Sequence, residues 1–164
     1  MEQRPSQSTS DENQEALEEE DRPSEIEVPF DPSKIDIIVK PMTIDSLLAR
    51  LKNDELDLTP DFQRQANLWG DKRKSRLIES VLLNIPLPSF YFSENNEGVY
   101  SVVDGLQRLC ALFHFVQLEE LNRVTQPKKP LGEFVLTNLQ YLKELEGKSF
   151  DQLDRPLQRR INEL

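Results

Sequence analysis

The apolar pattern of the chain changes at Asp104 and Gly105, and this change constrains the fold more than any other feature of the sequence. Residues 98–104, GVYSVVD, are rich in the residue types of a half-buried strand. Residues 106–118 then carry apolar side chains at helical spacing, namely Leu109, Leu112, Phe113 and Val116. A strand that leads directly into an amphipathic helix requires a mixed architecture, so we predict an α/β domain of the α+β kind.

The rest of the chain supplies more elements of both types. Two further helices are predicted at 42–53, with Thr43 as N-cap, and at 71–84, with Asp71 as a cap. The run 89–94 and the strand 98–104 are separated by turn residues, which predicts a β-hairpin. We also expect short strands at 34–41, 55–58 and 134–137, loops at 59–70 and 123–133, and a last helix near Pro156 after a cap at Ser149.

Charge separates the first 30 residues from the rest. They hold ten acidic residues and two arginines, a net charge of −8, whereas the other residues carry only −2 of the total of −10. Such a polar segment cannot bury enough apolar surface to order itself, so we predict a disordered acidic tail over 1–30. It serves either as a solvating leader or as a mimic of nucleic acid toward a basic partner. The nearly neutral remainder argues against a general nucleic-acid-binding surface.

The remaining residues divide into one folded domain, 34–122, and a C-terminal helical extension, 123–164. The chain stops inside a helical pattern, and for this reason we expect the extension to be truncated.

No apolar run reaches the length needed to cross a membrane, and the N-terminus lacks a hydrophobic signal region. The sequence therefore predicts a cytoplasmic protein without a membrane partner.

Cysteine and histidine are too scarce for several kinds of site. Cys110 and His114 are the only residues of their types, which excludes an internal disulfide framework and a cysteine-rich zinc site. The single histidine leaves little for a histidine-based metal site or a Ser–His–Asp triad. The two residues lie four residues apart in an apolar helix pattern, so we expect both to pack in the core rather than to act in catalysis.

The residues at the change of pattern have the chemistry of an anion site. A helix N-terminus carries unpaired N–H groups and a partial positive charge, and Gly105 allows a ligand close to the main chain. Arg108 supplies a forked donor suited to phosphate, Gln107 can orient water or a base edge, and Asp104 can hold a metal or position water. The alternative is a capped turn in which Asp104 is the N-cap and Arg108 pairs with a surface carboxylate.

Two other polar clusters accompany the first. The loop TPDFQRQANLW repeats an acid followed by Gln-Arg, at Asp61, Gln63 and Arg64; alternatively its aromatic residues pack beneath the loop, with Arg64 stacked on Trp69. The predicted helix 71–84 begins with four bases, Lys72, Arg73, Lys74 and Arg76. Bases there oppose the helix dipole, so they form either a solvated face or a further anion site.

Three blocks of the sequence, PDFQRQANLW, KSRLIESVLLNIPLPSFYFSE and YSVVDGLQRLCAL, together resemble the N-terminal domain family of GmrSD-type restriction endonucleases. The resemblance runs from about residue 40 to 120 and implies a ParB/sulfiredoxin-like fold with a small mixed sheet, a β-hairpin and flanking helices. It also implies binding, and hydrolysis, of a nucleoside triphosphate (GTP, ATP or CTP) with Mg²⁺, in a restriction system that acts in phage defence.

The family's Asp-Gly-Gln-Gln-Arg (DGQQR) motif corresponds to Asp104, Gly105, Gln107 and Arg108, with Leu106 in place of the first glutamine. The resemblance implies catalytic roles for Asp104 and Gln107, nucleotide contacts from Asp61, Gln63, Arg64, Gly105 and Arg108, and Asp104 as a metal ligand. Leu106 removes one polar group, so binding without hydrolysis is the alternative.

Other members of the superfamily fit the chain less well. Sulfiredoxins place a cysteine directly after the glycine, where this chain has Leu106, and the DNA-binding ParB relatives add a helix-turn-helix that is not evident here. A His-Asn-His nuclease site cannot be built from one histidine. We therefore expect a separate nuclease subunit as partner, or DNA through that subunit; the alternative is a non-catalytic DNA-associated regulatory or protein-interaction module.

Overall fold

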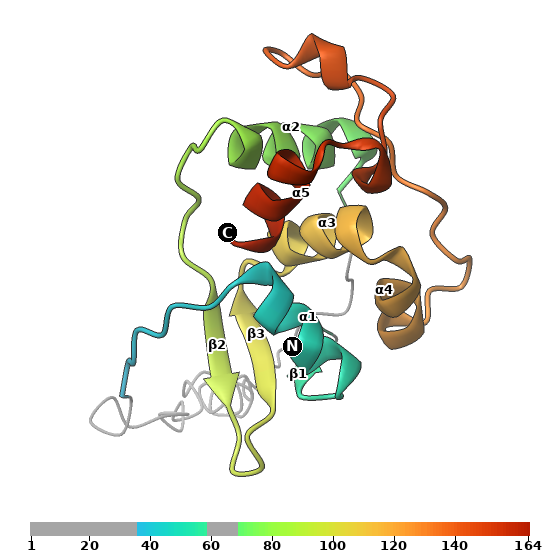
Figure 1. Cartoon of the computed structure of the whole chain (residues 1–164). Helices are drawn as coiled ribbons and strands as arrows, with labels where there is room; N and C mark the ends of the chain where they lie inside the picture. Colours follow the sequence, from blue (N-terminus) through green and yellow to red (C-terminus); the bar gives the residue numbers. More distant parts are fainter. Residues whose placement is uncertain (1–35, 59–68) are drawn as a thin grey trace, which may run out of the picture. The chain divides into compact units, whose positions relative to one another are not determined.

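A computed structural model describes residues 36–58 and 69–164 (Figure 1). The chain divides into two units, Met1–Lys40 and Pro41–Leu164. The predicted disordered tail lies outside the described residues.

The predicted strand 34–41 is wrong where it is described: residues 36–40 have no regular secondary structure, and Ile37, Ile38 and Val39 are exposed. β-Branched residues favour a strand only where a neighbouring strand and a packed face accept them.

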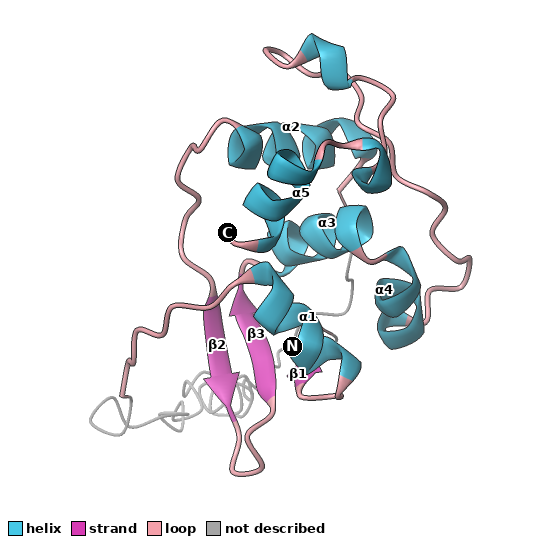
Figure 2. Cartoon of the chain, viewed as in Figure 1, coloured by secondary structure: helices cyan, strands magenta, loops and turns pink. Residues whose placement is uncertain are grey.

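The second unit contains a small mixed sheet, as expected from the sequence. Its strands are β1 (Leu56–Asp57), β2 (Tyr91–Glu94) and β3 (Tyr100–Asp104), in the order β1-β3-β2 (Figure 2). β2 and β3 form the predicted antiparallel hairpin, whose turn is closed by Asn95 Oδ1 accepting the N–H groups of Glu97 and Val99. β1 pairs with β3 in parallel, with Leu56 opposite Tyr100. The two strands therefore run in the same direction, and β3 extends three residues beyond the end of β1.

The first two helices form where the sequence places them. α1 (Ile44–Lys52) begins with a capping box in which Thr43 Oγ1 accepts the N–H of Ser46, and Ser46 Oγ accepts the N–H of Thr43. This arrangement satisfies two N–H groups that a helix start leaves without partners. α2 (Asp71–Leu82) begins after Gly70 as N-cap, so Asp71 is its first residue rather than its cap.

The predicted helix 106–118 is two helices, α3 (Leu106–Val116) and α4 (Leu118–Thr125). Gln117 separates them because its backbone angles, φ −147° and ψ 67°, are not helical. The predicted loop 123–133 therefore begins later, after Thr125. α3 is buried around most of its circumference, whereas α4 buries mainly Leu121.

The C-terminal part consists of short elements. These are the 3₁₀ turns η2 (Lys143–Leu145) and η3 (Phe150–Gln152), and α5 (Arg155–Asn162) with Pro156 in its first turn. The predicted strand 134–137 is absent; Leu136 instead exchanges two main-chain hydrogen bonds with the turn at Gly147 and Lys148. Ser149, predicted as the cap of the last helix, is instead the N-cap of η3, where its N–H donates to Gln152 Oε1, and α5 begins after Asp154.

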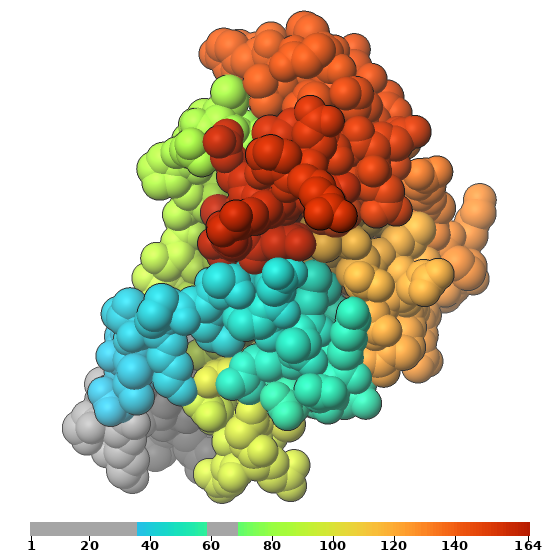
Figure 3. All heavy atoms as spheres, in the orientation of Figure 1, coloured from blue at the N-terminus to red at the C-terminus, as the bar shows by residue number. Residues whose placement is uncertain are grey.

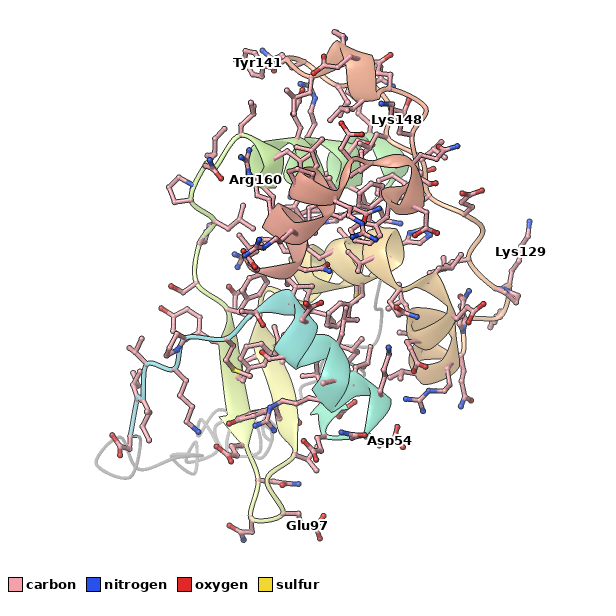
Figure 4. The ribbon with its side chains drawn as sticks, in the orientation of Figure 1. Asp54, Glu97, Lys129, Tyr141, Lys148 and Arg160 are labelled. Carbon is pink, nitrogen blue, oxygen red and sulfur yellow. The ribbon has the colours of Figure 1, made fainter. Side chains whose placement is uncertain are left out.

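A single hydrophobic core joins these elements. α5 packs against both α1 and α2, and the space-filling view shows the C-terminal residues covering the region between these two helices (Figure 3). Arg160 of α5, labelled in Figure 4, donates from its Nη1 to the main-chain oxygen of Leu82 at 2.6 Å, which satisfies a carbonyl at the end of α2. Among the described residues, none of the helices has both the length and the apolar character of a membrane span.

Candidate functional site

The site predicted from the motif lies where β3 ends and α3 begins. Asp104 is the last residue of β3, and Gly105 is the N-cap of α3 with φ +95°, in the left-handed region. A Cβ at Gly105 would lie 2.5 Å from Cδ1 of Phe90, so a side chain is excluded by strain and by contact. Asp104 is not the N-cap, and the N-cap itself provides no capping side chain. The first turn of α3 thus keeps the partial positive charge of a helix start.

Arg108 fixes the first turn of α3 to the chain that leads into β2. Its Nη1 donates to the carbonyl oxygen of Pro88 and its Nη2 to that of Ser89 at 3.2 Å. Its guanidinium also lies over the ring of Phe90, with Cζ 4.8 Å from the centroid. The Arg108 side chain is only 14% exposed. These contacts hold the guanidinium in place beside the start of α3.

The fourth contact of Arg108 is with Asp104. Nη2 of Arg108 lies 3.0 Å from Oδ2 of Asp104, whose side chain is 67% exposed. The arginine does pair with a surface carboxylate, as the alternative interpretation of the motif expected. Because the carboxylate lies largely in solvent, another anion can replace it beside the guanidinium at small cost.

The other two positions of the motif face different environments. Gln107 is half-buried in the first turn of α3. Leu106 is 3% exposed and belongs to the hydrophobic core. The residue that departs from the family motif therefore contributes to packing in this chain.

The second predicted cluster falls on residues 59–68. Asp61, Gln63 and Arg64 lie outside the described residues, and so does the expected stacking of Arg64 on Trp69. Their segment, residues 59–68, directly follows β1 and Leu58. β1 runs parallel to β3 and ends with Asp57 opposite Ser101, three residues before Asp104.

The basic residues at the start of α2 are distributed over separate partners. The guanidinium of Arg73 lies 4.0 Å from the ring centroid of Trp69, and Arg76 binds Glu79 and Gln140. Lys74 is 3% exposed and its Nζ contacts His114, while Lys72 is exposed. The bases do not converge on one anion site, and three of them serve contacts within the domain.

The part of the motif that the structure describes has no ready-made metal cluster. In the described ranges, no group of three histidine, cysteine or acidic side chains could hold a metal ion. A groove of about 560 Å³ lies elsewhere, along α5, and is lined by Arg155, Pro156, Arg159, Arg160 and Glu163. Asp104 offers one exposed carboxylate, which suits a Mg²⁺ ion held mainly by phosphate oxygens and water.

Sequence reasoning missed the partners of Arg108. The carbonyls of Pro88 and Ser89 and the ring of Phe90 define its position, but main-chain acceptors leave no trace in side-chain patterns. The only available signal was a Pro-Ser-Phe run directly before the hairpin.

Comparison with known proteins identifies the family. The model of the GmrSD restriction endonuclease N-terminal domain matches residues 44–164. Comparisons with curated proteins and with solved structures gave no match. The match to the family model covers most of the chain, including all the helices and strands described above. It associates the chain with restriction systems. The chain therefore belongs to the family of GmrSD restriction endonuclease N-terminal domains.

Proposed function

We propose that this domain binds a nucleoside triphosphate and hydrolyses it within a restriction system that acts in phage defence. The observation that supports this most directly is the junction at Gly105. There, a glycine in the left-handed conformation opens α3 beside an anchored guanidinium, at the carboxyl end of β3, which runs parallel to β1. Ligands of mixed and parallel sheets commonly bind outside such a strand end, and helix starts favour phosphate.

Each residue of the motif would have a separate role in binding or hydrolysis of the nucleotide, according to its chemistry. The first amides of α3 and the guanidinium of Arg108 would bind phosphate oxygens, where a forked donor is most effective. Gln107 would orient the attacking water. Asp61, Gln63 and Arg64 would join the site from the segment after β1, with Arg64 as a second phosphate contact.

Asp104 would make nucleotide binding depend on Mg²⁺. When phosphate takes over Nη2 of Arg108, the carboxylate of Asp104 is released and can bind Mg²⁺, which would neutralise charge on the phosphates. Without a cation, a carboxylate beside a polyphosphate opposes binding. The affinity for nucleotide should therefore rise with Mg²⁺ in the native protein, and less so in Asp104→Asn.

The direct test is calorimetry and thermal shift with GTP, ATP and CTP, with and without Mg²⁺, together with an assay of released phosphate. Arg64→Ala should weaken binding at least ten-fold, since one charged hydrogen bond contributes about 1.5–3 kcal/mol. The matched control is Arg159→Ala, because Arg159 lies on α5 and is 77% exposed. If no nucleotide binds the native protein, or if both variants bind equally, the proposal is refuted.

Leu106 favours a second candidate, a non-catalytic module. A buried leucine in the motif supplies no polar group to the reaction, so a regulatory role through DNA or through a separate nuclease subunit is the alternative. Nucleotide binding without phosphate release would support this role. A steep dependence of DNA affinity on salt would show direct contact with several phosphates, whereas a flat response would leave the nuclease subunit as the partner. Either role places the protein in the cytoplasm.

A further inference from the structure

The one histidine of the chain makes a buried contact with a lysine. His114 on α3 is 6% exposed and Lys74 on α2 is 3% exposed. Nζ of Lys74 lies 2.8 Å from Nδ1 of His114, and Nε2 of His114 lies 2.8 Å from the carbonyl oxygen of Gly132. Two basic side chains in contact inside a protein are costly unless one of them is neutral.

The partners of the ring determine its protonation state. A carbonyl oxygen can only accept, so Nε2 must carry the hydrogen that it donates to Gly132. A lysine ammonium can only donate, so Nδ1 must be the unprotonated nitrogen. The contact is consistent with a single form of His114, the neutral tautomer protonated at Nε2.

Residues 131–142, which we name the strap, lie along α2 and are held by side chains of α2 and α3. At one end, Nε2 of His114 on α3 donates to the carbonyl oxygen of Gly132, while Lys74 contacts the other ring nitrogen. In the middle, Ser75 Oγ accepts the N–H of Thr137 at 2.9 Å. At the other end, Glu79 accepts the N–H groups of residues 140, 141 and 142.

The ring also packs against the strap. The centroid of His114 lies 5.3 Å from that of Phe134, which is 3% exposed and also contacts Phe115 edge-on. Nζ of Lys74 lies 5.8 Å from the same ring. A positive charge on His114 would therefore lie directly against Phe134, the buried aromatic residue of the strap.

We propose that His114 and Lys74 form a proton-operated latch, which holds the start of the strap against α2 and α3 while His114 is neutral and releases it when His114 is protonated. A protonated ring has no lone pair for Lys74, and two positive charges cannot remain 2.8 Å apart in a buried site. Opening the contact brings water to both groups and frees Gly132 and Phe134.

Few charges offset this repulsion. Asp71 on α2 is the nearest carboxylate, with Oδ1 3.9 Å from Nζ of Lys74, but its side chain is 65% exposed. Cys110, one turn earlier on α3, is the other titratable group on this face of the helix. From the strap, the ring meets the Gly132 carbonyl and the Phe134 ring, neither of which titrates.

The direction of the pKa changes agrees with this geometry. Burial lowers the pKa of His114, the bond to Gly132 opposes that effect, and the charge of Lys74 lowers the pKa further. Burial also lowers the pKa of Lys74, and Asp71 partly restores it. Because the folded pKa of His114 lies below 6.5, the latch is closed above this pH and opens as the pH falls through the folded value.

The single histidine allows a direct test by NMR on the full chain. A long-range ¹H–¹⁵N spectrum at pH 7.5 should show the Nε2-protonated tautomer alone, and the imidazole should titrate with a midpoint below 6.5. Hydrogen exchange, corrected for the intrinsic effect of pH, should show protection of residues 131–137 falling about ten-fold or more through that midpoint. The hairpin 91–104 should keep its protection and serves as the internal reference.

Lys74→Met supplies the variant, since it replaces a buried ammonium by an apolar chain of similar length. It should raise the titration midpoint of His114 and weaken the pH dependence of exchange in the strap. Lys72→Met, on the exposed side of the same helix, is the matched control and should leave both unchanged. Any of four results would overturn the latch. These are a mixture of tautomers, a titration midpoint at or above 6.5, protection of the strap that does not change through the titration, and equal behaviour of the two variants.

Discussion

Glu79 provides the sharpest test of how α2 holds the strap. The carboxylate is 3% exposed. Its Oε1 accepts the N–H groups of residues 140, 141 and 142 at 2.8, 2.6 and 3.0 Å. Its Oε2 lies 3.2 Å from Nη1 of Arg76. Burial alone would raise the pKa of Glu79, but the three N–H groups and Arg76 outweigh it and lower the pKa from 4.5 to about 2.

The size of the effect follows from linkage. A pKa lowered from 4.5 to about 2 corresponds to roughly 3 kcal/mol of preference for the folded state when Glu79 is ionised. Solvent near Arg76 screens part of this interaction, so we expect Glu79→Gln to lower the free energy of unfolding by about 2 kcal/mol at pH 7. A glutamine oxygen can keep the three N–H groups of the strap, but the amide N–H₂ then faces Nη1 of Arg76 and the N–H of Gln140.

The pH dependence gives the sign of the effect. Because the folded pKa is lowered, the stabilisation is complete above about pH 4.5 and is lost as the pH falls toward 2. Urea unfolding followed by circular dichroism at pH 7, 5 and 3.5 should therefore show the native protein and Glu79→Gln converging as the pH falls. Glu97→Gln, in the exposed hairpin turn, makes the same change of charge and should stay within about 0.5 kcal/mol of the native protein. A loss at Glu79 that is no larger than this, or one that does not depend on pH, would refute the reasoning.

Two smaller perturbations test the start of α3 and the start of α1. Gly105→Ala should destabilise the domain by about 2 kcal/mol or more in thermal unfolding, because φ +95° is strained for alanine and its Cβ would lie 2.5 Å from Phe90; an unchanged melting temperature would contradict the close packing. Thr43→Ala should cost about 1 kcal/mol in urea unfolding, since it removes the acceptor for the N–H of Ser46; Thr43→Ser keeps that acceptor and should recover most of the loss.

Local signals in the sequence predicted the parts of the fold that depend on neighbouring residues. The cap at Thr43, the hairpin and the helix after Gly105 rest on spacing and turn chemistry within a few positions, and all three are confirmed. The break at Gln117 was missed because apolar residues continue at helical spacing on both sides of it. The exposed run at 36–40 was predicted as a strand because β propensity does not reveal whether a partner strand exists.

The contacts within the domain were less accessible to sequence reasoning. Lys74 and Glu79 look like ordinary surface charges of an amphipathic helix, yet both are buried by residues about 40 and 60 positions away. The motif at Asp104 was recognisable, whereas the carbonyls that hold Arg108 carry no side-chain signature. The roles assigned to Asp61, Gln63 and Arg64 remain predictions.

The packing of α5 has a consequence for synthesis on the ribosome. Ile161 is fully buried, and its helix packs against α1, which is made more than a hundred residues earlier. When α1, the sheet and α3 have emerged from the ribosome, α5 has not yet been made. The hydrophobic core then still lacks the residues that α5 contributes. α1 must wait until α5 emerges, and during that interval its apolar face is available to chaperones.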